Sequence, residues 1–114
     1  MKENRILLVS FDFALGIIAF CELLENEKKF VIARQLLRAG SSIGANIREA
    51  QNAESKADFI HKMKISAKEA DETEYWLELC KQSENYPNPD KLLIQIVEIK
   101  KLLNTIISTM KKKT

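Results

Sequence analysis

Apolar residues recur at steps of three and four along most of this chain, and this spacing constrains the fold more than any other feature. Between Leu92 and Met110 the steps are four, three, four, three and four, as in the seam of a coiled coil. Small and apolar residues from Phe30 to Ile47 keep the same period. Such steps place side chains on one face of an α-helix. No strand signal interrupts the pattern, so the sequence predicts an all-α fold.

Short polar segments divide this pattern into four helices. Ser55 followed by Asp58 resembles a capping box with Ser55 as the N-cap. Asn88, Pro89 and Asp90 form a second start signal, with Asn88 as the N-cap and Pro89 as the first helical residue. The 114 residues form one domain, 1–114. Four helices with short connections predict an up-down-up-down antiparallel four-helix bundle. The expected helices span residues 3–25, 28–52, 55–84 and 89–111.

The N-terminal apolar segment allows two interpretations. Fifteen of the nineteen residues from Ile6 to Leu24 are apolar, as in a signal peptide or a membrane-spanning helix. Asp12 argues against insertion, because a carboxylate at the centre of a membrane helix costs about 2.5–3.5 kcal/mol. We therefore favour a helix that is buried on most of its circumference, with no membrane partner. Cys21 and Cys80 form no CxxC motif, which favours two buried thiols and a cytoplasmic location.

Gly40 and Gly44 raise the question of a phosphate-binding loop. A Walker loop requires GxxxxGK[ST] after a strand, and these two glycines are four residues apart with no lysine following. They lie instead one turn apart on one face of the helix expected over 28–52. Each glycine costs about 1 kcal/mol relative to alanine inside a helix, which close approach of a neighbouring backbone offsets. The pair therefore predicts a close-packing notch.

Polar residues on the same helix predict a buried network. Ser42, Asn46 and Glu49 share a face on successive turns of the helix. A partner from the following helix, such as Lys68 or Glu72, would complete the network. Such groups set the register and orientation of packed helices, so a structural role is expected.

Basic residues are the candidates for contact with nucleic acid. Arg34, Arg38 and Arg48 share one face of the helix over 28–52, and the chain closes on a lysine tail formed by Lys111, Lys112 and Lys113. Alternatively, the arginines pair with the acidic residues of the next helix and form a solvated face. The formal net charge of +2 does not decide between these interpretations.

An enzymatic function has little support in the residues. The single histidine, His61, lacks the Glu-x-x-His pattern of di-metal bundles. We expect no catalytic residue, no metal and no cofactor. The enzymatic alternative that remains is a pair of buried carboxylates, such as Glu49 and Glu72, sharing a proton.

Three motifs carry a resemblance to a known family. They are Ser-Ile-x-Ala-Asn-Ile-x-Glu at 42–49, Ser-Lys-x-x-Phe at 55–59 and Glu-x-x-Tyr-Trp-Leu at 72–77. The chain resembles the small bacterial four-helix bundle proteins known from intervening sequences in 23S ribosomal RNA genes, most closely over 35–80. It departs from them at Ala50, where many members carry glycine, and in the first connection, which lacks the usual proline.

The resemblance implies a homopentamer. A related accessory protein of diversity-generating retroelements binds nucleic acid and works with a reverse transcriptase, whereas most members have no assigned activity. We therefore expect a non-enzymatic oligomeric interaction module whose partners are itself and RNA, DNA or a protein such as a reverse transcriptase. The alternative is a purely protein-binding scaffold.

Overall fold

The computed structural model describes the backbone of residues 2–113 and the side chains of residues 5–113. Within this range the protein consists of four helices without a strand, which confirms the all-α prediction. Each end of a helix lies within two residues of the expected position. The helices are α1 (Lys2–Asn26), α2 (Phe30–Ala50), α3 (Lys56–Gln82) and α4 (Asp90–Lys112).

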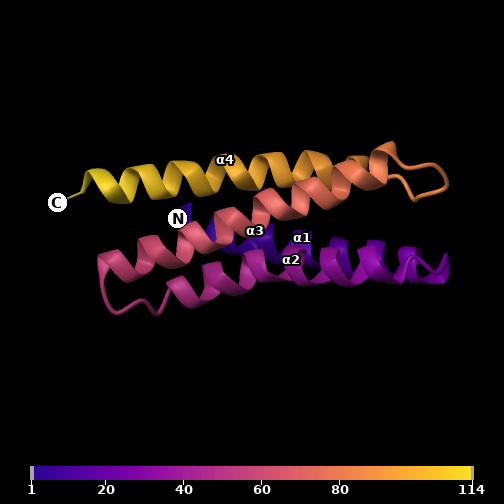
Figure 1. Ribbon diagram of the computed structural model, residues 1–114. Coiled ribbons are helices and arrows are strands. Elements are labelled where there is room, and N and C mark those ends of the chain that lie inside the picture. Colours follow the sequence, from indigo (N-terminus) through magenta and orange to yellow (C-terminus); the bar gives the residue numbers. More distant parts are fainter. Residues whose placement is uncertain (1, 114) are drawn as a thin grey trace.

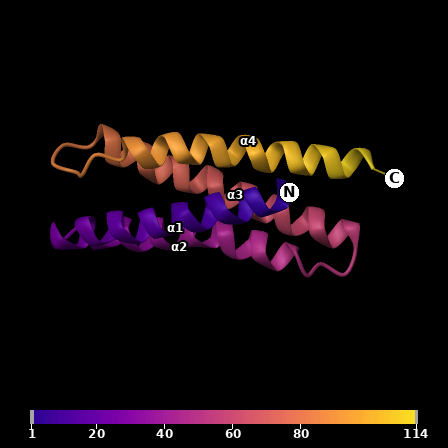
Figure 2. The same cartoon turned by 180° about the vertical axis from the view of Figure 1, so that it is seen from behind.

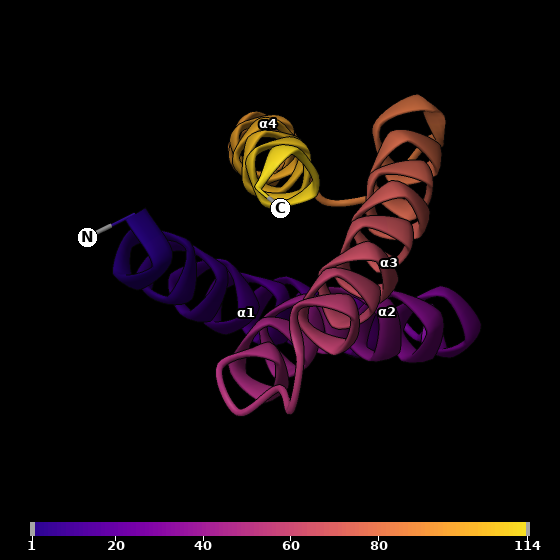
Figure 3. The same ribbon diagram turned by 90° about the vertical axis from the view of Figure 1, so that its left-hand side faces the viewer.

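The helices pack side by side into an elongated body of 50 × 20 × 20 Å. In Figure 1 the chain turns back at each connection, so that every helix lies beside the preceding one. α1 also contacts α4, which closes the bundle. Figure 3 views the four helices along the length of the bundle. The start of α1, the α2–α3 connection and the end of α4 lie towards one end in both side views (Figures 1 and 2). We call this the termini end.

The helix starts follow from local polar residues. Ser55 precedes α3 in an extended conformation, and its hydroxyl accepts a hydrogen bond from the backbone N–H of Asp58 at 3.0 Å, which confirms the predicted cap. The start of α4 differs from the prediction by one residue. Pro89 has φ −95° and ψ 11°, so the helix begins at Asp90 and not at Pro89. The side chain of Asn88 still accepts the N–H of Asp90, at 2.8 Å.

One hydrophobic core runs through the bundle. Phe13 and Ile17 of α1 are fully buried, as are Leu36, Met63 and Ile96 of the other helices. The inner residues of each helix recur at the expected steps of three and four, so the core follows directly from the apolar period.

Both cysteines belong to this core as free thiols. The thiol of Cys21 donates a hydrogen bond to the backbone oxygen of Ala33 at 3.4 Å. Burial raises the pKa of Cys21 to about 12, and the nearby Glu25 and Cys80 add to this effect. Burial alone raises the pKa of Cys80 to about 11. The structure thus places both thiols in the buried, protonated state expected of small core residues.

The two glycines of α2 face α1 at close range. A methyl group added at Gly40 would lie 2.9 Å from two side-chain carbons of Ile17. The same addition at Gly44 would lie 3.3 Å from the hydroxyl oxygen of Ser10. Ile17 is fully buried and branched at Cβ, so it has little freedom to move away. Gly40 is therefore the tighter of the two contacts.

Alanine at these two positions should have different effects. We expect Gly40→Ala to be less stable than Gly44→Ala by about 1–2 kcal/mol, because overpacking costs about 1–3 kcal/mol while both variants gain about 1 kcal/mol of helix propensity. Urea unfolding followed by circular dichroism measures the difference, with each variant serving as control for the other. Equal midpoints, or a more stable Gly40→Ala, would contradict the packing argument.

The buried thiols predict a dependence of stability on alkaline pH. Because their folded pKa values are raised above 9.0, the unfolded chain loses thiol protons first, and stability falls as the pH rises from 9.0 towards 11. We expect thiolate absorbance in the unfolded protein, but not in the folded protein, within this interval. A Cys21→Ala/Cys80→Ala variant controls for titrating lysines. Thiolate absorbance in the folded protein at pH 9 would overturn the expectation.

Candidate functional site

Four large apolar side chains of α1 form a line on the outside of the bundle. Their spacing of three, four and three residues places them on the side of the helix opposite the core. We call this line the α1 ridge: Leu8, Phe11, Leu15 and Ile18, with exposed fractions of 72%, 58%, 53% and 45%. Soluble monomers rarely expose contiguous apolar surface of this kind, so the ridge is a candidate interaction surface.

The ridge corrects the expectation that this helix is buried on most of its circumference. Among the residues that the structure describes, α1 contacts only α2 and α4, so its outer side has no neighbour from the same chain there. By length and composition, the segment Arg5–Asn26 is apolar enough to cross a membrane, a test that core helices also pass. Phe13, Ile17 and Leu24 of the same helix are fully buried in the core. Insertion of α1 into a membrane would therefore remove these three residues from the bundle.

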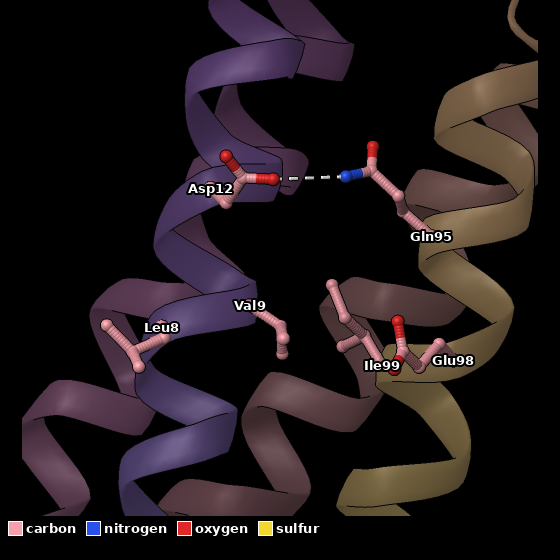
Figure 4. A pocket seen from close by; sticks show the side chains of 6 residues that line it. All are labelled: Leu8, Val9, Asp12, Gln95, Glu98 and Ile99. Atoms are coloured by element: carbon pink, nitrogen blue, oxygen red, sulfur yellow. Dashed lines mark hydrogen bonds between the residues drawn. The ribbon is translucent and has the colours of Figure 1, made fainter.

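A groove between α1 and α4 flanks the ridge on one side. Figure 4 shows Val9 and Asp12 of α1 directed towards α4, whereas Leu8, at the edge of the groove, points away from α4. The amide nitrogen of Gln95 spans the groove and donates a hydrogen bond to a carboxylate oxygen of Asp12 at 3.3 Å. The groove continues past this pair towards Leu23, with volumes of about 300 and 430 Å³ in its two parts.

A second groove, between α1 and α2, flanks the ridge on the other side. Its volume is about 250 Å³, and small residues of α2 form one wall, namely Ser41, Gly44 and Ala45. Arg48 lies at the same wall, and Phe11 of the ridge borders the groove. The surface around α1 is therefore a raised apolar line between two shallow depressions, a shape that suits contact with another helix better than enclosure of a small molecule.

The predicted polar network is not assembled as expected. The side chains of Ser42 and Asn46 bond back to their own helix, donating to the backbone oxygens of Arg38 at 2.7 Å and of Ser42 at 2.8 Å. Glu49 pairs with Lys62 at 3.0 Å and not with Lys68. This correction has a geometric reason, because Glu49 near the end of α2 lies opposite the first turns of α3. Lys68 is exposed.

Glu72 belongs to a different cluster on α2 and α3. Its carboxylate forms an ion pair with Arg38 and accepts a hydrogen bond from the indole N–H of Trp76 at 2.9 Å. Arg38 also reaches Glu69 at 3.4 Å. Because Glu49 pairs with Lys62 at a separate position, Glu49 and Glu72 do not form the shared-proton pair considered from the sequence.

The basic residues proposed for nucleic-acid contact are not equivalent. Arg38 is held by two carboxylates of α3, as the alternative of a paired face predicted. Arg34 is exposed one turn earlier. Arg48 is also exposed, but it borders the α1–α2 groove about 15 Å along the helix from Arg38. The three arginines therefore do not act as one uncompensated stripe.

The lysines at the end of the chain are part of a helix. Lys111 and Lys112 form the last turn of α4, and Lys113 follows it directly. The predicted lysine tail is thus helical at Lys111 and Lys112, and all three side chains are exposed at the termini end. Cations in the last turn also interact favourably with the helix dipole.

Sequence reasoning missed two buried serines that lie where helices pack against each other. Ser66 of α3 is fully buried, and its hydroxyl donates to the backbone oxygen of Ile43 at 2.9 Å. Ser10 of α1 lies buried against Gly44. Each serine interrupts an apolar face of its helix, and that interruption was the sequence signal that could have identified it.

In the part of the chain that the structure describes, no group of three His, Cys, Asp or Glu residues could hold a metal ion. His61 is exposed.

Comparisons with known proteins identify relatives of this chain. Residues 2–105 match the family model described as 23S rRNA-intervening sequence protein. A crystal structure of a protein with unknown function from the S23 ribosomal protein family, from Bacteroides thetaiotaomicron VPI-5482, is 48% identical. The similarity covers 95% of this chain and 99% of that chain, with a TM-score of 0.89. No protein with curated annotation matches.

The cluster around Arg38 should contribute little to stability. We expect Arg38→Gln to change the free energy of unfolding by less than about 1 kcal/mol, because exposed ion pairs contribute about 0–1 kcal/mol. Glu72→Gln retains an acceptor for the indole, whereas Glu72→Leu removes it and should shift the emission of Trp76, the single tryptophan. Urea unfolding followed by fluorescence measures both effects. A loss of several kcal/mol in Arg38→Gln would assign this residue a larger structural role.

Proposed function

The chain belongs to the 23S rRNA-intervening sequence protein family, and from this premise we propose that it is a non-enzymatic interaction module that assembles with itself. Its up-down-up-down bundle would form a closed ring of five subunits, the number that the family resemblance implies. The observation that carries the proposal is the α1 ridge, whose side chains are half or more exposed at most positions.

The ridge has the spacing of a helix–helix seam. Residues at steps of three and four insert between side chains of a facing helix, and burying apolar surface contributes about 25 cal/mol per Å². The flanking grooves offer matching depressions, particularly where Ser41, Gly44 and Ala45 leave space. A ridge of one copy that enters a groove of the next joins two different surfaces. Contacts of this heterologous kind build rings when the rotation between subunits closes.

Contact with nucleic acid is the second function that we propose for the module. The observation that favours it is the position of Lys111, Lys112 and Lys113 at the termini end, where the first turns of α3 also carry lysines. A purely protein-binding scaffold is the alternative, with a partner such as a reverse transcriptase bound to the assembled ring.

The oligomer is tested by mass in solution. At micromolar concentration we expect light scattering to give about five times the chain mass of 13.1 kDa. Phe11→Ser/Leu15→Ser should reduce the mass to that of one chain while circular dichroism stays helical, because these residues are exposed within one subunit. Val31→Ser, which removes an apolar side chain of α2 that is more exposed than Phe11 or Leu15, is the control.

Two results would count against this assembly. A wild-type protein that is monomeric under these conditions would refute self-association. If Val31→Ser dissociates the oligomer as completely as the ridge variant does, the ridge is not the specific interface.

A further inference from the structure

A second exposed apolar surface lies between α3 and α4, away from the α1 ridge. It is a groove of about 500 Å³ whose apolar wall consists of Leu93, Ile94 and Val97 of α4. Ile94 is 74% exposed and Val97 is 41% exposed. The groove lies near the α3–α4 connection, at the end of the bundle opposite the termini end (Figure 1). We call it the α3–α4 groove.

The fold of α4 does not require Ile94 and Val97 to be apolar. The core side of this helix is formed by other residues, among them Leu92, Ile96 and Ile99, which are buried. β-branched side chains are also less favourable at an exposed helix position than alanine, lysine or glutamate, because the helix restricts their rotamers. Two such residues, three apart on the outside of α4, therefore indicate a contact surface.

Carboxylates form a row along the α3 edge of the groove. Asp71, Glu74 and Glu78 follow one another at steps of three and four, so they share one side of α3. The ammonium group of Lys100 on α4 contacts Glu74 at 2.7 Å and Asp71 at 2.9 Å. One cation therefore faces two carboxylates in this row, and Glu78 continues the row into the groove.

The charges around the groove are not balanced. Lys81 and Asp90 line the groove and pair with each other at 3.3 Å. Glu78, the third charged lining residue, is exposed and belongs to none of the ion pairs among the described residues. Lys100 leaves one further carboxylate charge over, and the exposed Lys101 of α4 offsets one of these two charges. The α3 edge thus keeps an excess of negative charge beside the apolar wall.

Tyr75 adds an exposed aromatic ring beside the row of carboxylates. It lies one turn from Asp71 and one turn from Glu78, and it is 58% exposed. The ring of Trp76 packs edge to face against it, with the ring centroids 5.4 Å apart. Aromatic rings attract the ammonium group of lysine and the guanidinium group of arginine. The α3 edge therefore combines two features that favour a cation.

We propose that the α3–α4 groove binds an amphipathic helix of a second protein, whose apolar residues recur at steps of three and four and are flanked by lysine or arginine. The apolar residues would cover Ile94 and Val97, and the basic residues would meet the carboxylates of the α3 edge. This inference rests on the interaction-module function proposed above, but it does not depend on assembly of the ring. Phosphates of a nucleic acid or an anionic membrane would meet the same carboxylates and be repelled.

The α1 ridge of a second copy fits this groove poorly. Glu22 continues the line of the ridge, and Asp12 lies beside it. Arg5 at the start of the ridge is paired with Glu98 of its own chain. The ridge would therefore bring carboxylates towards the carboxylates of α3, and like charges in an interface oppose binding. A ring built through the α1 ridge and the grooves beside it would leave the α3–α4 groove open to another protein.

Binding is measured by fluorescence anisotropy with three labelled synthetic peptides. The lysine peptide has leucine at steps of three and four, lysine at the flanking positions and alanine elsewhere. The glutamate peptide carries glutamate in place of lysine, and the scrambled peptide has the composition of the lysine peptide without its apolar period. We expect the wild-type protein to bind the lysine peptide with a Kd below about 100 μM, and the other two at least about tenfold more weakly.

A serine variant locates the binding on α4. Ile94→Ser/Val97→Ser should weaken binding of the lysine peptide about tenfold or more, because it truncates the central apolar contacts. The control is Val31→Ser/Leu37→Ser, which removes two apolar side chains of α2 with closely matching exposed fractions of 73% and 40%. Circular dichroism should remain helical in both variants, because all four side chains are exposed within one subunit.

A charge reversal tests the chemistry of the partner. Glu78→Lys should shift the ratio of the two affinities towards the glutamate peptide by about fivefold or more, because each exposed ion pair contributes up to about 1 kcal/mol and the reversal changes its sign for both peptides. Glu25→Lys, at an exposed carboxylate of α1, is the control and should leave the ratio unchanged.

Several results would overturn the proposal. They are no binding of the lysine peptide by the wild type at about 100 μM, equal binding of the three peptides, or an equal loss in the α2 control variant. Binding of labelled RNA that is lost in Ile94→Ser/Val97→Ser would assign the groove to nucleic acid instead. Light scattering separates the groove from the ring. A fall in mass in this variant would make the groove an interface between copies, and the proposal would fail. If the wild type is monomeric but the variant selectively loses the lysine peptide, the groove stands and the ring does not.

Discussion

The close approach of α1 and α2 at Gly40 determines the arrangement of the rest of the molecule. Because Gly40 has no side chain, Ile17 of α1 can lie directly against the backbone of α2. This contact turns the Phe13 and Ile17 side of α1 towards the core, which leaves Phe11 and Leu15 on the outside. A larger residue at Gly40 would displace or rotate α1, and the exposed line would then contain other residues. The core packing of α1 and the set of residues that it exposes thus both depend on the contact between Ile17 and Gly40.

The helices and their ends could be predicted because the signals for them are local. The cap at Ser55 depends on a residue three positions away, and the apolar period of α4 lies within that helix. The start of α4 lies one residue later than predicted, because Pro89, with ψ 11°, does not have helical dihedral angles. The spacing of Gly40 and Gly44 also predicted the close-packing notch, but it did not identify Ile17 as the residue that packs against Gly40.

Contacts between helices were much harder to predict. The partner of Glu49 depends on the register of α2 against α3, and a shift of less than two turns separates Lys62 from Lys68. The apolar residues around α1 indicated burial on most sides, but a helix at the corner of a four-helix bundle has only two neighbours. One chain therefore cannot cover the outer side of α1.

The seam between α1 and α4 has a further consequence for how the chain reaches its native state. The other helix contacts join neighbours in sequence, whereas this one joins helices separated by two others. Contacts that close short loops form early, and those that close long loops form late. During synthesis α1 can pair with α2, and α2 with α3, before α4 has left the ribosome. Until then the side of α1 that faces α4 in the folded chain stays exposed. This side includes Gly16, which lies next to Leu92 of α4 in the folded chain. The nascent chain is therefore most prone to misassociation in this interval.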